Sequence, residues 1–357
     1  MTAGRSIRSR RPRGLRRSSV LAAAVLVGAL VGGLAGGAAQ ALPASATAAG
    51  APLSSVLGVY AGPGNVEGVR QLGRALGHQP TFAMDFLAQT SWGTITHVAP
   101  LADPWRDAGY RMIWGVPMLP SSGGSLATGA TGAYDHYFRL VGRRLVAAGQ
   151  GSSVIRLGWE FNGFWFPWSA PGHAAQFVDY FRQIVTTMRS VPGSHFTFDW
   201  NPVRGDQGAG TLAAYYPGDR YVDGVGLDIY DTEWAHYPGS RAEFRKIETE
   251  RFGLDWLARF AARHGKPIVL PEVGLGWGRS ATGRAVHRKG AVSGGDDAVF
   301  IAEMARWVAH HDVAEITFWD YGTSSVARGR NPRALSSLVT AFGTKSTPKG
   351  SAAAGHR

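Results

Sequence analysis

The chain has 357 residues, of which 45% are hydrophobic and 11% aromatic, so it can bury a sizeable core and disorder throughout is excluded. Its formal net charge is +12, but residues 1–48 hold seven Arg and residues 345–357 hold three basic residues, with no acid in either segment. Residues 49–344 carry 27 basic and 25 acidic residues, and so neutral a body argues against a nucleic-acid partner. The absence of cysteine excludes disulfides, thiolate catalysis and Cys-ligated metal sites.

Residues 1–48 have the pattern of a signal peptide. An Arg-rich stretch precedes an uncharged apolar run, and small-residue sites follow at Ala39-Gln40-Ala41 and Ala44-Ser45-Ala46. This order predicts export by the Sec route or, given Arg16-Arg17, by the twin-arginine route, and hence a secreted protein. A retained membrane anchor over residues 18–42 is the alternative, because that run is long enough to span a bilayer.

Residues 50–344 alternate short apolar segments with longer amphipathic ones, and residues 345–357 form a basic tail that we expect to be disordered. The predicted strands are 56–61, 81–87, 110–117, 153–161, 195–201, 223–230, 267–273 and 315–321. The predicted helices are 66–76, 134–149, 173–190, 241–264, 296–311 and 332–342. Eight alternations predict one domain, a (β/α)8 barrel. A doubly wound sheet is the alternative, but Ala61-Gly62-Pro63-Gly64 does not fit its G-x-G-x-x-G turn.

In such a barrel the functional residues lie at the carboxyl ends of the strands. Glu160 ends the fourth predicted strand and Glu272 the seventh. Paired carboxylates are typical of glycoside hydrolysis, where one donates a proton to the leaving oxygen and the other attacks the sugar or activates water. The alternative is that both are ordinary polar residues at the rim.

Strand alternation predicts the surroundings of this pair. It places Arg156 and Glu160 on the face that lines the barrel mouth and Trp159 on the face toward the helices. Arg156 would keep at least one carboxylate ionised, and Tyr230 could donate a hydrogen bond to Glu272.

All twelve Trp residues lie between positions 92 and 319. Sugars stack on indole rings, so the Trp residues near strand ends are expected to bind a glycan: Trp165, Trp168, Trp200, Trp277 and Trp319. Core packing is the alternative use of Trp, and we expect it for about half of the twelve, with Trp159, Trp256 and Trp307 the first choices.

Two segments rich in metal-binding residue types have simpler interpretations. His310-His311-Asp312 ends a predicted helix on the face opposite the active site, which favours surface histidines. Gly294-Gly295-Asp296-Asp297 favours a loop and helix N-cap over a calcium site. We therefore expect neither a metal nor another cofactor.

Three ordered segments, VIRLGWEFNGFWFPW (154–168), YYPGDRYVDGVGLDIYD (215–231) and KPIVLPEVG (266–274), resemble the family 26 glycoside hydrolases. The resemblance implies a clan A (β/α)8 barrel that cleaves β-linked polysaccharides with retention, with Glu160 as acid/base and Glu272 as nucleophile. It implies that Arg156, Asn162, Trp165, Tyr230 and Trp319 shape the site. The places of Trp168, Trp200, Trp114 and Asp228 at or near strand ends make them further candidates for substrate binding.

Two positions depart from the family pattern. Trp159 replaces the His that usually precedes the acid/base, and Gly115 follows Trp114 where a Trp-His pair is common. Both positions lie where the family binds the sugar, so the substrate stays open among β-mannan, mixed-linkage β-glucan, β-1,3-xylan and another bacterial glycan.

The sequence thus predicts a secreted, monomeric, retaining endo-β-glycanase without a cofactor. The alternatives are a non-catalytic glycan-binding barrel and a membrane-tethered hydrolase of an envelope polysaccharide. The protein would meet a membrane only if residues 1–48 are not cleaved.

Overall fold

The computed structural model describes residues 52–233, 241–276, 292–293 and 295–344. The predicted signal peptide, the basic tail and Trp277 lie outside the described residues. Within the described ranges, no helix combines the length and the apolar character that crossing a bilayer requires.

Eight parallel strand positions close into a barrel. The strands are β1 Leu57–Tyr60, β2 Phe82–Phe86, β3 Arg111–Val116, β4 Val154–Leu157, β5 Thr197–Trp200, β6 Gly224–Gly226 with β7 Ile229–Tyr230, β9 Ile268–Gly274 and β11 Val313–Trp319. Each position pairs in parallel with the next, and β11 pairs with both β9 and β1, which closes the sheet on itself. The predicted (β/α)8 barrel is confirmed.

The sixth position is interrupted between β6 and β7, both of which pair with β9. At the interruption the Asp228 N–H donates to the Pro202 carbonyl at 3.1 Å, and Asp228 forms an isolated bridge with Val203. The chain turns there toward the segment that follows β5, so the single strand predicted over 223–230 forms two short strands.

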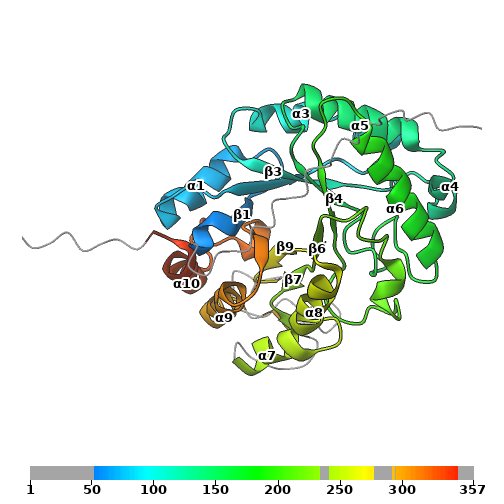
Figure 1. Cartoon of the computed structure of the whole chain (residues 1–357). Coiled ribbons are helices and arrows are strands. Elements are labelled where there is room, and N and C mark those ends of the chain that lie inside the picture. The colour runs from blue at the N-terminus through cyan, green and yellow to red at the C-terminus, as the bar shows by residue number, and fades with distance from the viewer. Residues whose placement is uncertain (1–51, 234–240, 277–291, 294, 345–357) are drawn as a thin grey trace, which may run out of the picture. The chain divides into compact units, whose positions relative to one another are not determined.

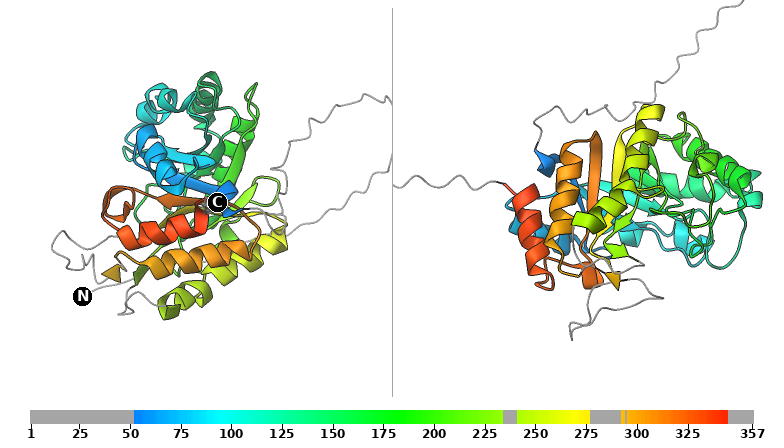
Figure 2. Two further views of the ribbon diagram at one scale, coloured as in Figure 1. Left: turned by 90° about the vertical axis from the view of Figure 1, so that its left-hand side faces the viewer. Right: turned by 90° about the horizontal axis from the view of Figure 1, so that it is seen from below.

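Helices lie outside the strands (Figure 1). The longer ones are α1 Val66–Leu76, α5 Asp135–Ala147, α6 Ala174–Arg189, α7 Arg241–Thr249, α8 Leu254–His264, α9 Ala298–Ala309 and α10 Pro332–Phe342. α9 contacts both α10 and α7, and Figure 2 shows these helices side by side. The helix predicted over 241–264 is broken before α8, where Phe252 adopts a left-handed φ of 59°.

Short elements complete the fold, and the sequence patterns did not predict them. They are α2 Trp92–Thr96, α3 Ala99–Ala102, α4 Leu126–Ala130, the 3-10 helices η1 Leu53–Val56, η2 Asp103–Trp105, η3 Leu212–Tyr215 and η4 Gly322–Ser324, and the antiparallel pair β8 Thr232–Glu233 and β10 Val292–Ser293. Between β5 and β6, residues that the structure describes throughout, η3 takes the place of an outer α-helix.

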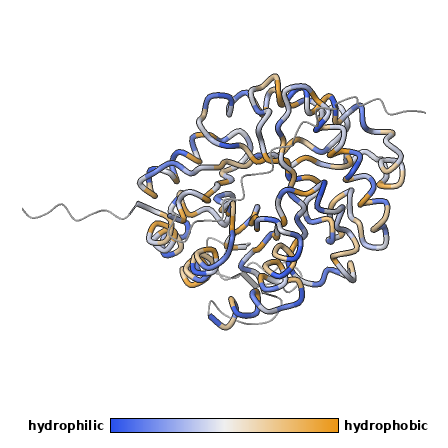
Figure 3. The backbone as a smooth tube through the Cα atoms, viewed as in Figure 1, coloured by the Kyte–Doolittle hydropathy of each residue, from blue (hydrophilic) through white to orange (hydrophobic). Residues whose placement is uncertain are grey.

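α1 shows how the sequence specifies an outer helix. The Asn65 side chain accepts a hydrogen bond from the Gly68 N–H and caps the first turn, and Gly77 ends the helix at a left-handed φ of 81°. The buried side chains Val69, Leu72 and Leu76 recur every three or four residues, so one face packs on the barrel. Figure 3 shows the same mixture of hydrophilic and hydrophobic residues along the other outer helices.

Candidate active site

The chain leaves the ideal strand geometry directly after β4. Gly158 has a φ of 57°, and a Cβ there would lie 2.3 Å from the Met118 sulfur, so both conformation and space require glycine. Glu160 is also left-handed, with a φ of 53°, and its N–H donates to the Asn201 carbonyl at 3.0 Å. A non-glycine residue in this conformation is uncommon and is typical of functional sites.

This turn ends the alternation of side chains between the two faces of β4, which was predicted to continue through Trp159. Trp159 is buried, as expected for a core residue, but its ring centroid lies 5.5 Å from the guanidinium carbon of Arg156 and 5.0 Å from the ring of Phe86. Trp159 therefore packs against the site residues rather than on the helix face alone.

Arg156 connects three strand positions inside the barrel. Its guanidinium is fully buried and donates to the carboxylates of Glu272 and Asp228, while its Nε donates to Asn201 Oδ1 at 2.8 Å. Burial alone would lower the pKa of Arg156, but the charges of Asp228 and Glu272 hold that pKa above its usual value. Arg156 is thus a fixed positive charge beneath the site.

Glu272 is held at both carboxylate oxygens. Oε1 accepts from Arg156, and Oε2 accepts from the Tyr230 hydroxyl, as the sequence analysis expected of Tyr230. The side chain is only 6% exposed. Charge-assisted hydrogen bonds of this kind orient a carboxylate and favour its ionised form.

Glu160 lies in a different environment. Its side chain is half-buried, and Oε2 accepts one hydrogen bond from Trp165 Nε1 at 2.6 Å. Burial and the nearby charge of Glu272 raise the pKa of Glu160 to about 8, against the opposing effects of Arg156 and Trp165. Glu160 can therefore hold a proton at neutral pH, whereas Glu272 is bound by Arg156 and Tyr230, so the two carboxylates lie in different environments.

The two carboxylates also lie close together. Glu160, Glu272 and Asp228 each place an oxygen within 4.8 Å of the others. The carboxyl groups of retaining glycosidases are about 5–5.5 Å apart, and those of inverting enzymes about 6.5–9.5 Å. A cation in this group would compete with Arg156, which bonds two of its three carboxylates.

Aromatic side chains flank the pair. Trp319, the last residue of β11, lies 4.2 Å from Tyr60 and 6.2 Å from Tyr230 between ring centroids. Among the described residues, the large hydrophobic side chains that are exposed are Phe164 at 75%, Trp165 at 42% and Tyr321 at 42%. Trp165 bonds Glu160 and Phe164 packs on Trp165, while Tyr321 contacts Tyr60, so all three lie at this end of the barrel.

Sequence reasoning missed Tyr60, Phe86, Asn201 and Tyr321 as site residues. Tyr60 and Phe86 are the last residues of β1 and β2, so the strand-end rule applied to Glu160 would have found both. Nothing in the sequence pattern indicates that Asn201 would bond Arg156, because that contact depends on the side-chain geometry of two strands.

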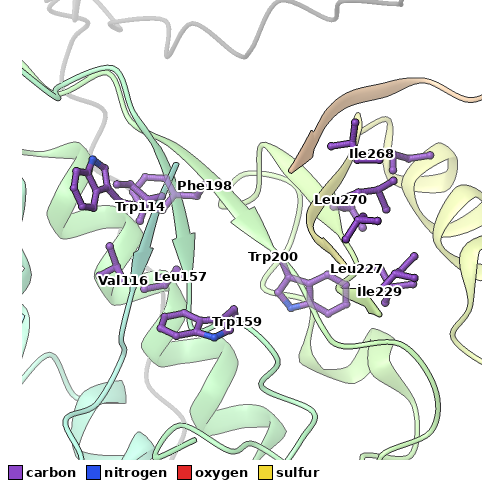
Figure 4. Close-up of a cluster of buried hydrophobic side chains, with 14 of the residues drawn as sticks. Trp114, Val116, Leu157, Trp159, Phe198, Trp200, Leu227, Ile229, Ile268 and Leu270 are labelled. Carbon is purple, nitrogen blue, oxygen red and sulfur yellow. The ribbon is translucent and has the colours of Figure 1, made fainter. Parts of the chain in front are cut away.

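The structure places three of the proposed sugar-binding tryptophans elsewhere. Trp114, Trp168 and Trp200 have no exposed surface, and Figure 4 shows Trp114 and Trp200 among other buried apolar side chains. Trp168 Nε1 donates to the Trp159 carbonyl, and Trp200 Nε1 donates to the Tyr215 carbonyl. These side chains offer no face to a ligand and instead form the core, as buried Trp307 does.

Asn162 and Asp228 are committed to protein contacts. Asn162 is fully buried, donates to the Val203 carbonyl and accepts from the Val203 N–H, so its amide ties the loop after β4 to that after β5. Asp228 is fully buried and pairs with Arg156. Their contacts hold the loops and charges around the site, so neither side chain is placed to face an entering ligand.

Comparison with known proteins agrees with this geometry. Residues 150–272 match the model of glycosyl hydrolase family 26. A mannan endo-1,4-beta-mannosidase of Bifidobacterium adolescentis is 31% identical over 157 residues, a match that spans 43% of this chain and 14% of that protein.

Solved structures share the fold at low sequence identity. A modular endo-beta-1,4-mannanase from Cellulomonas fimi superposes with a TM-score of 0.59 and 17% identity, covering 82% of this chain and 72% of its own. A family 26 beta-mannanase from Bacteroides ovatus superposes with a TM-score of 0.54 and 15% identity, covering 81% of this chain and 88% of its own. The matched family segment begins just before β4 and ends at Glu272, so it includes both glutamates of the site. The chain therefore resembles glycosyl hydrolase family 26 over the segment that holds both glutamates, and it shares the barrel fold of the solved mannanases.

Proposed function

We propose that the chain is a secreted, retaining endo-β-glycanase that hydrolyses a β-mannan-type polysaccharide. The observation that carries this proposal is the pair Glu160 and Glu272, whose oxygens lie within 4.8 Å of each other. The pKa of Glu160 is raised, while Glu272 accepts hydrogen bonds from Arg156 and Tyr230. The mannan-type substrate rests on the family and on the bifidobacterial relative. Secretion rests on the order of Arg-rich, apolar and small-residue segments over residues 1–48.

In the first step the Glu272 carboxylate attacks the anomeric carbon while Glu160 donates its proton to the leaving glycosidic oxygen. The bond between the anomeric carbon and that oxygen breaks, and a glycosyl ester forms on Glu272. In the second step Glu160 removes a proton from water, the water oxygen bonds the anomeric carbon, and Glu272 leaves as a carboxylate. Arg156 and Tyr230 orient Glu272 throughout and stabilise its charge.

The electrostatics of the pair suit both steps. The charge of Glu272 contributes to the raised pKa of Glu160, so Glu160 holds a proton before the attack. Ester formation removes that charge, which lowers the pKa of Glu160 and prepares it to act as a base.

Reducing-end release from mannan, mixed-linkage β-glucan, β-1,3-xylan and cellulose tests the proposal. We expect turnover of mannan that Glu272→Gln abolishes. Glu315→Gln is the matched control, because Glu315 is a buried glutamate on β11 that bonds Thr317 and none of the site residues. Binding without turnover on any polymer would instead support a glycan-binding barrel.

A substrate with a good leaving group separates the two roles. An activated aryl glycoside needs little proton donation, so Glu160→Gln should retain formation of the glycosyl ester with this substrate but lose about 10²–10⁴-fold on the polysaccharide. Equal losses of Glu160→Gln on both substrates would contradict the assignment of Glu160 as the acid.

A further inference from the structure

The large hydrophobic side chains that are exposed among the described residues share one location. Phe164, Trp165 and Tyr321 all lie at the end of the barrel that carries Glu160 and Glu272. A single exposed aromatic side chain is ordinary, but apolar side chains that gather around a polar site are typical of a ligand-binding groove. Their coincidence with the carboxylate pair indicates that they contact the ligand of that pair.

Phe164 and Tyr321 lie on opposite sides of the barrel mouth. Phe164 belongs to the loop after β4, and Tyr321 comes two residues after the end of β11. Strand pairing runs β11-β1-β2-β3-β4 in one direction around the barrel and β4-β5-β6-β9-β11 in the other, so four steps separate β4 from β11 either way. A linear ligand that crosses the mouth can therefore contact both side chains.

The Phe164 side belongs to the leaving group. Trp165 Nε1 donates to Glu160 Oε2 at 2.6 Å, and Glu160 is the proposed donor of the proton to the leaving oxygen. The sugar that carries this oxygen must lie within hydrogen-bond reach of Glu160, and therefore next to Trp165. The Phe164 ring lies 5.3 Å from that of Trp165 at an interplanar angle of 74°, and at 75% exposure it extends this aromatic surface outward.

The Tyr321 side belongs to the part of the ligand that is transferred to the nucleophile. Glu272 accepts a hydrogen bond from Tyr230, whose ring lies 6.2 Å from that of Trp319. The Tyr321 ring follows at 6.4 Å from Trp319, in edge-to-face contact at 80°. The sugar that Glu272 attacks thus lies toward Trp319, and the next sugar lies toward Tyr321.

The Tyr321 ring is held in place by a close approach to the backbone. A Cβ at Gly62, in the loop after β1, would lie 2.8 Å from Cδ2 and Cε2 of this ring, so only glycine leaves room for it. The ring centroid is also 5.7 Å from that of Tyr60, the last residue of β1. An aromatic side chain that is already fixed loses little conformational entropy when a ligand stacks on it.

We propose that Phe164 and Tyr321 are stacking platforms for sugar units outward of those against Trp165 and Trp319, Phe164 on the leaving-group side and Tyr321 on the opposite side. This inference rests on the proposed glycanase function and deepens it. Sugar rings present apolar C–H faces, and these two aromatic rings are the exposed surface that such faces would cover. A ligand that fills both platforms extends past the carboxylate pair in both directions, so the platforms favour cleavage within a polysaccharide over release of a terminal sugar.

Substrates that reach one platform without the other test the inference. An aryl β-mannobioside has two sugars on the Tyr321 side and only its aryl group on the Phe164 side, whereas β-1,4-mannohexaose and mannan extend to both. Phe164→Ala should lower kcat/KM about tenfold on mannohexaose and mannan, for the loss of one apolar ring contact, and leave kcat/KM on the aryl mannobioside unchanged. Tyr321→Ala should lower kcat/KM about tenfold on all three substrates.

Matched variants separate the platforms from general damage to the protein. Phe164→Tyr and Tyr321→Phe keep an aromatic ring and should retain most of the parent's kcat/KM on every substrate. Tyr137→Ala removes a half-buried aromatic ring from the outer helix α5, where it stacks on Trp92 at 4.4 Å, and should leave kcat/KM unchanged. If an Ala variant does not fold, Leu at the same position gives the comparison, because Leu also lacks the ring.

Two kinetic results would overturn the inference. Unchanged kcat/KM in both Ala variants would mean that neither ring contacts the substrate, and equal losses of Phe164→Ala on the aryl mannobioside and on mannohexaose would mean that Phe164 acts through the carboxylate pair. If the parent cleaves none of these substrates, the proposed function fails on its own, and calorimetric titration with mannohexaose decides about the platforms. Affinity that falls in both Ala variants would support them, and absence of binding to the parent would overturn them as well.

Discussion

Replacing Trp165 by Phe should change the pH dependence of catalysis while leaving the fold intact. The Trp165 Nε1–H donates to Glu160 Oε2 at 2.6 Å, and this bond favours the ionised carboxylate. Phe cannot donate, so the pKa of Glu160 should rise above its value of about 8. Because Glu160 must be protonated to act as the acid, the alkaline limb of kcat/KM should move to higher pH.

The size of the shift follows from the exposure of the donor. A hydrogen bond to a buried charged group contributes about 1.5–3 kcal/mol, but Trp165 is 42% exposed and water replaces part of the lost bond. We therefore expect a shift of about one pH unit, since one unit corresponds to about 1.4 kcal/mol. If Trp165 also stacks on the sugar, kcat/KM falls by a constant factor at every pH, which leaves the position of the limb unaffected.

The assay is kcat/KM on the preferred polysaccharide from pH 5 to 10 for the parent, Trp165→Phe and Phe164→Leu. Phe164 is the matched control, because it is 75% exposed and packs on Trp165 without a hydrogen bond to Glu160. Its alkaline limb should coincide with that of the parent. An alkaline limb of Trp165→Phe that stays in place or moves to lower pH would refute the role given to this hydrogen bond.

Three further predictions concern stability. Arg156→Met leaves the buried carboxylates of Asp228 and Glu272 without their cation and should cost about 3–5 kcal/mol in urea unfolding at pH 7. Burial raises the pKa of Glu315 from 4.5 to about 7, so the folded state holds this proton more tightly. The contribution of Glu315 to stability should be full below pH 4.5 and be lost, by about 3 kcal/mol, as pH rises through 7, and Glu315→Gln should remove that part of the pH dependence. Trp200→Ala opens a cavity at a fully buried position and should cost about 3–5 kcal/mol, read from the same unfolding curves.

The barrel and the carboxylate pair were predictable because both depend on simple periodicities. Eight apolar segments separated by amphipathic ones specify the fold, and parallel strands bring their carboxyl ends to one side. Glu160 and Glu272 were therefore expected on the same side of the barrel. The hydrogen bond of Tyr230 to Glu272 was predictable from the place of Tyr230 at the end of the sixth strand.

The roles of the tryptophans were less predictable, because Trp is suited both to the core and to sugar stacking. Trp165 closely follows one predicted strand and Trp200 lies at the end of another, yet Trp165 is 42% exposed and Trp200 fully buried. The difference arises from loop conformation: Trp165 lies in the irregular loop after β4, while Trp200 is the last residue of β5 and packs on Phe260 of α8. Alternation gives no information once the chain has left a strand.

The end of β4 also explains how two chemically identical side chains acquire different roles. An uninterrupted strand would point Arg156, Gly158 and Glu160 the same way, with both carboxylates competing for one guanidinium. Instead the left-handed turn through Gly158 and Glu160 leaves Glu160 bonded to Trp165, while Arg156 bonds Glu272. Glu272 is thus paired with a cation, whereas Glu160 makes no ion pair with Arg156 and has a raised pKa. The local departure from strand geometry, which periodicity cannot predict, is what gives the proposed acid and the proposed nucleophile different environments.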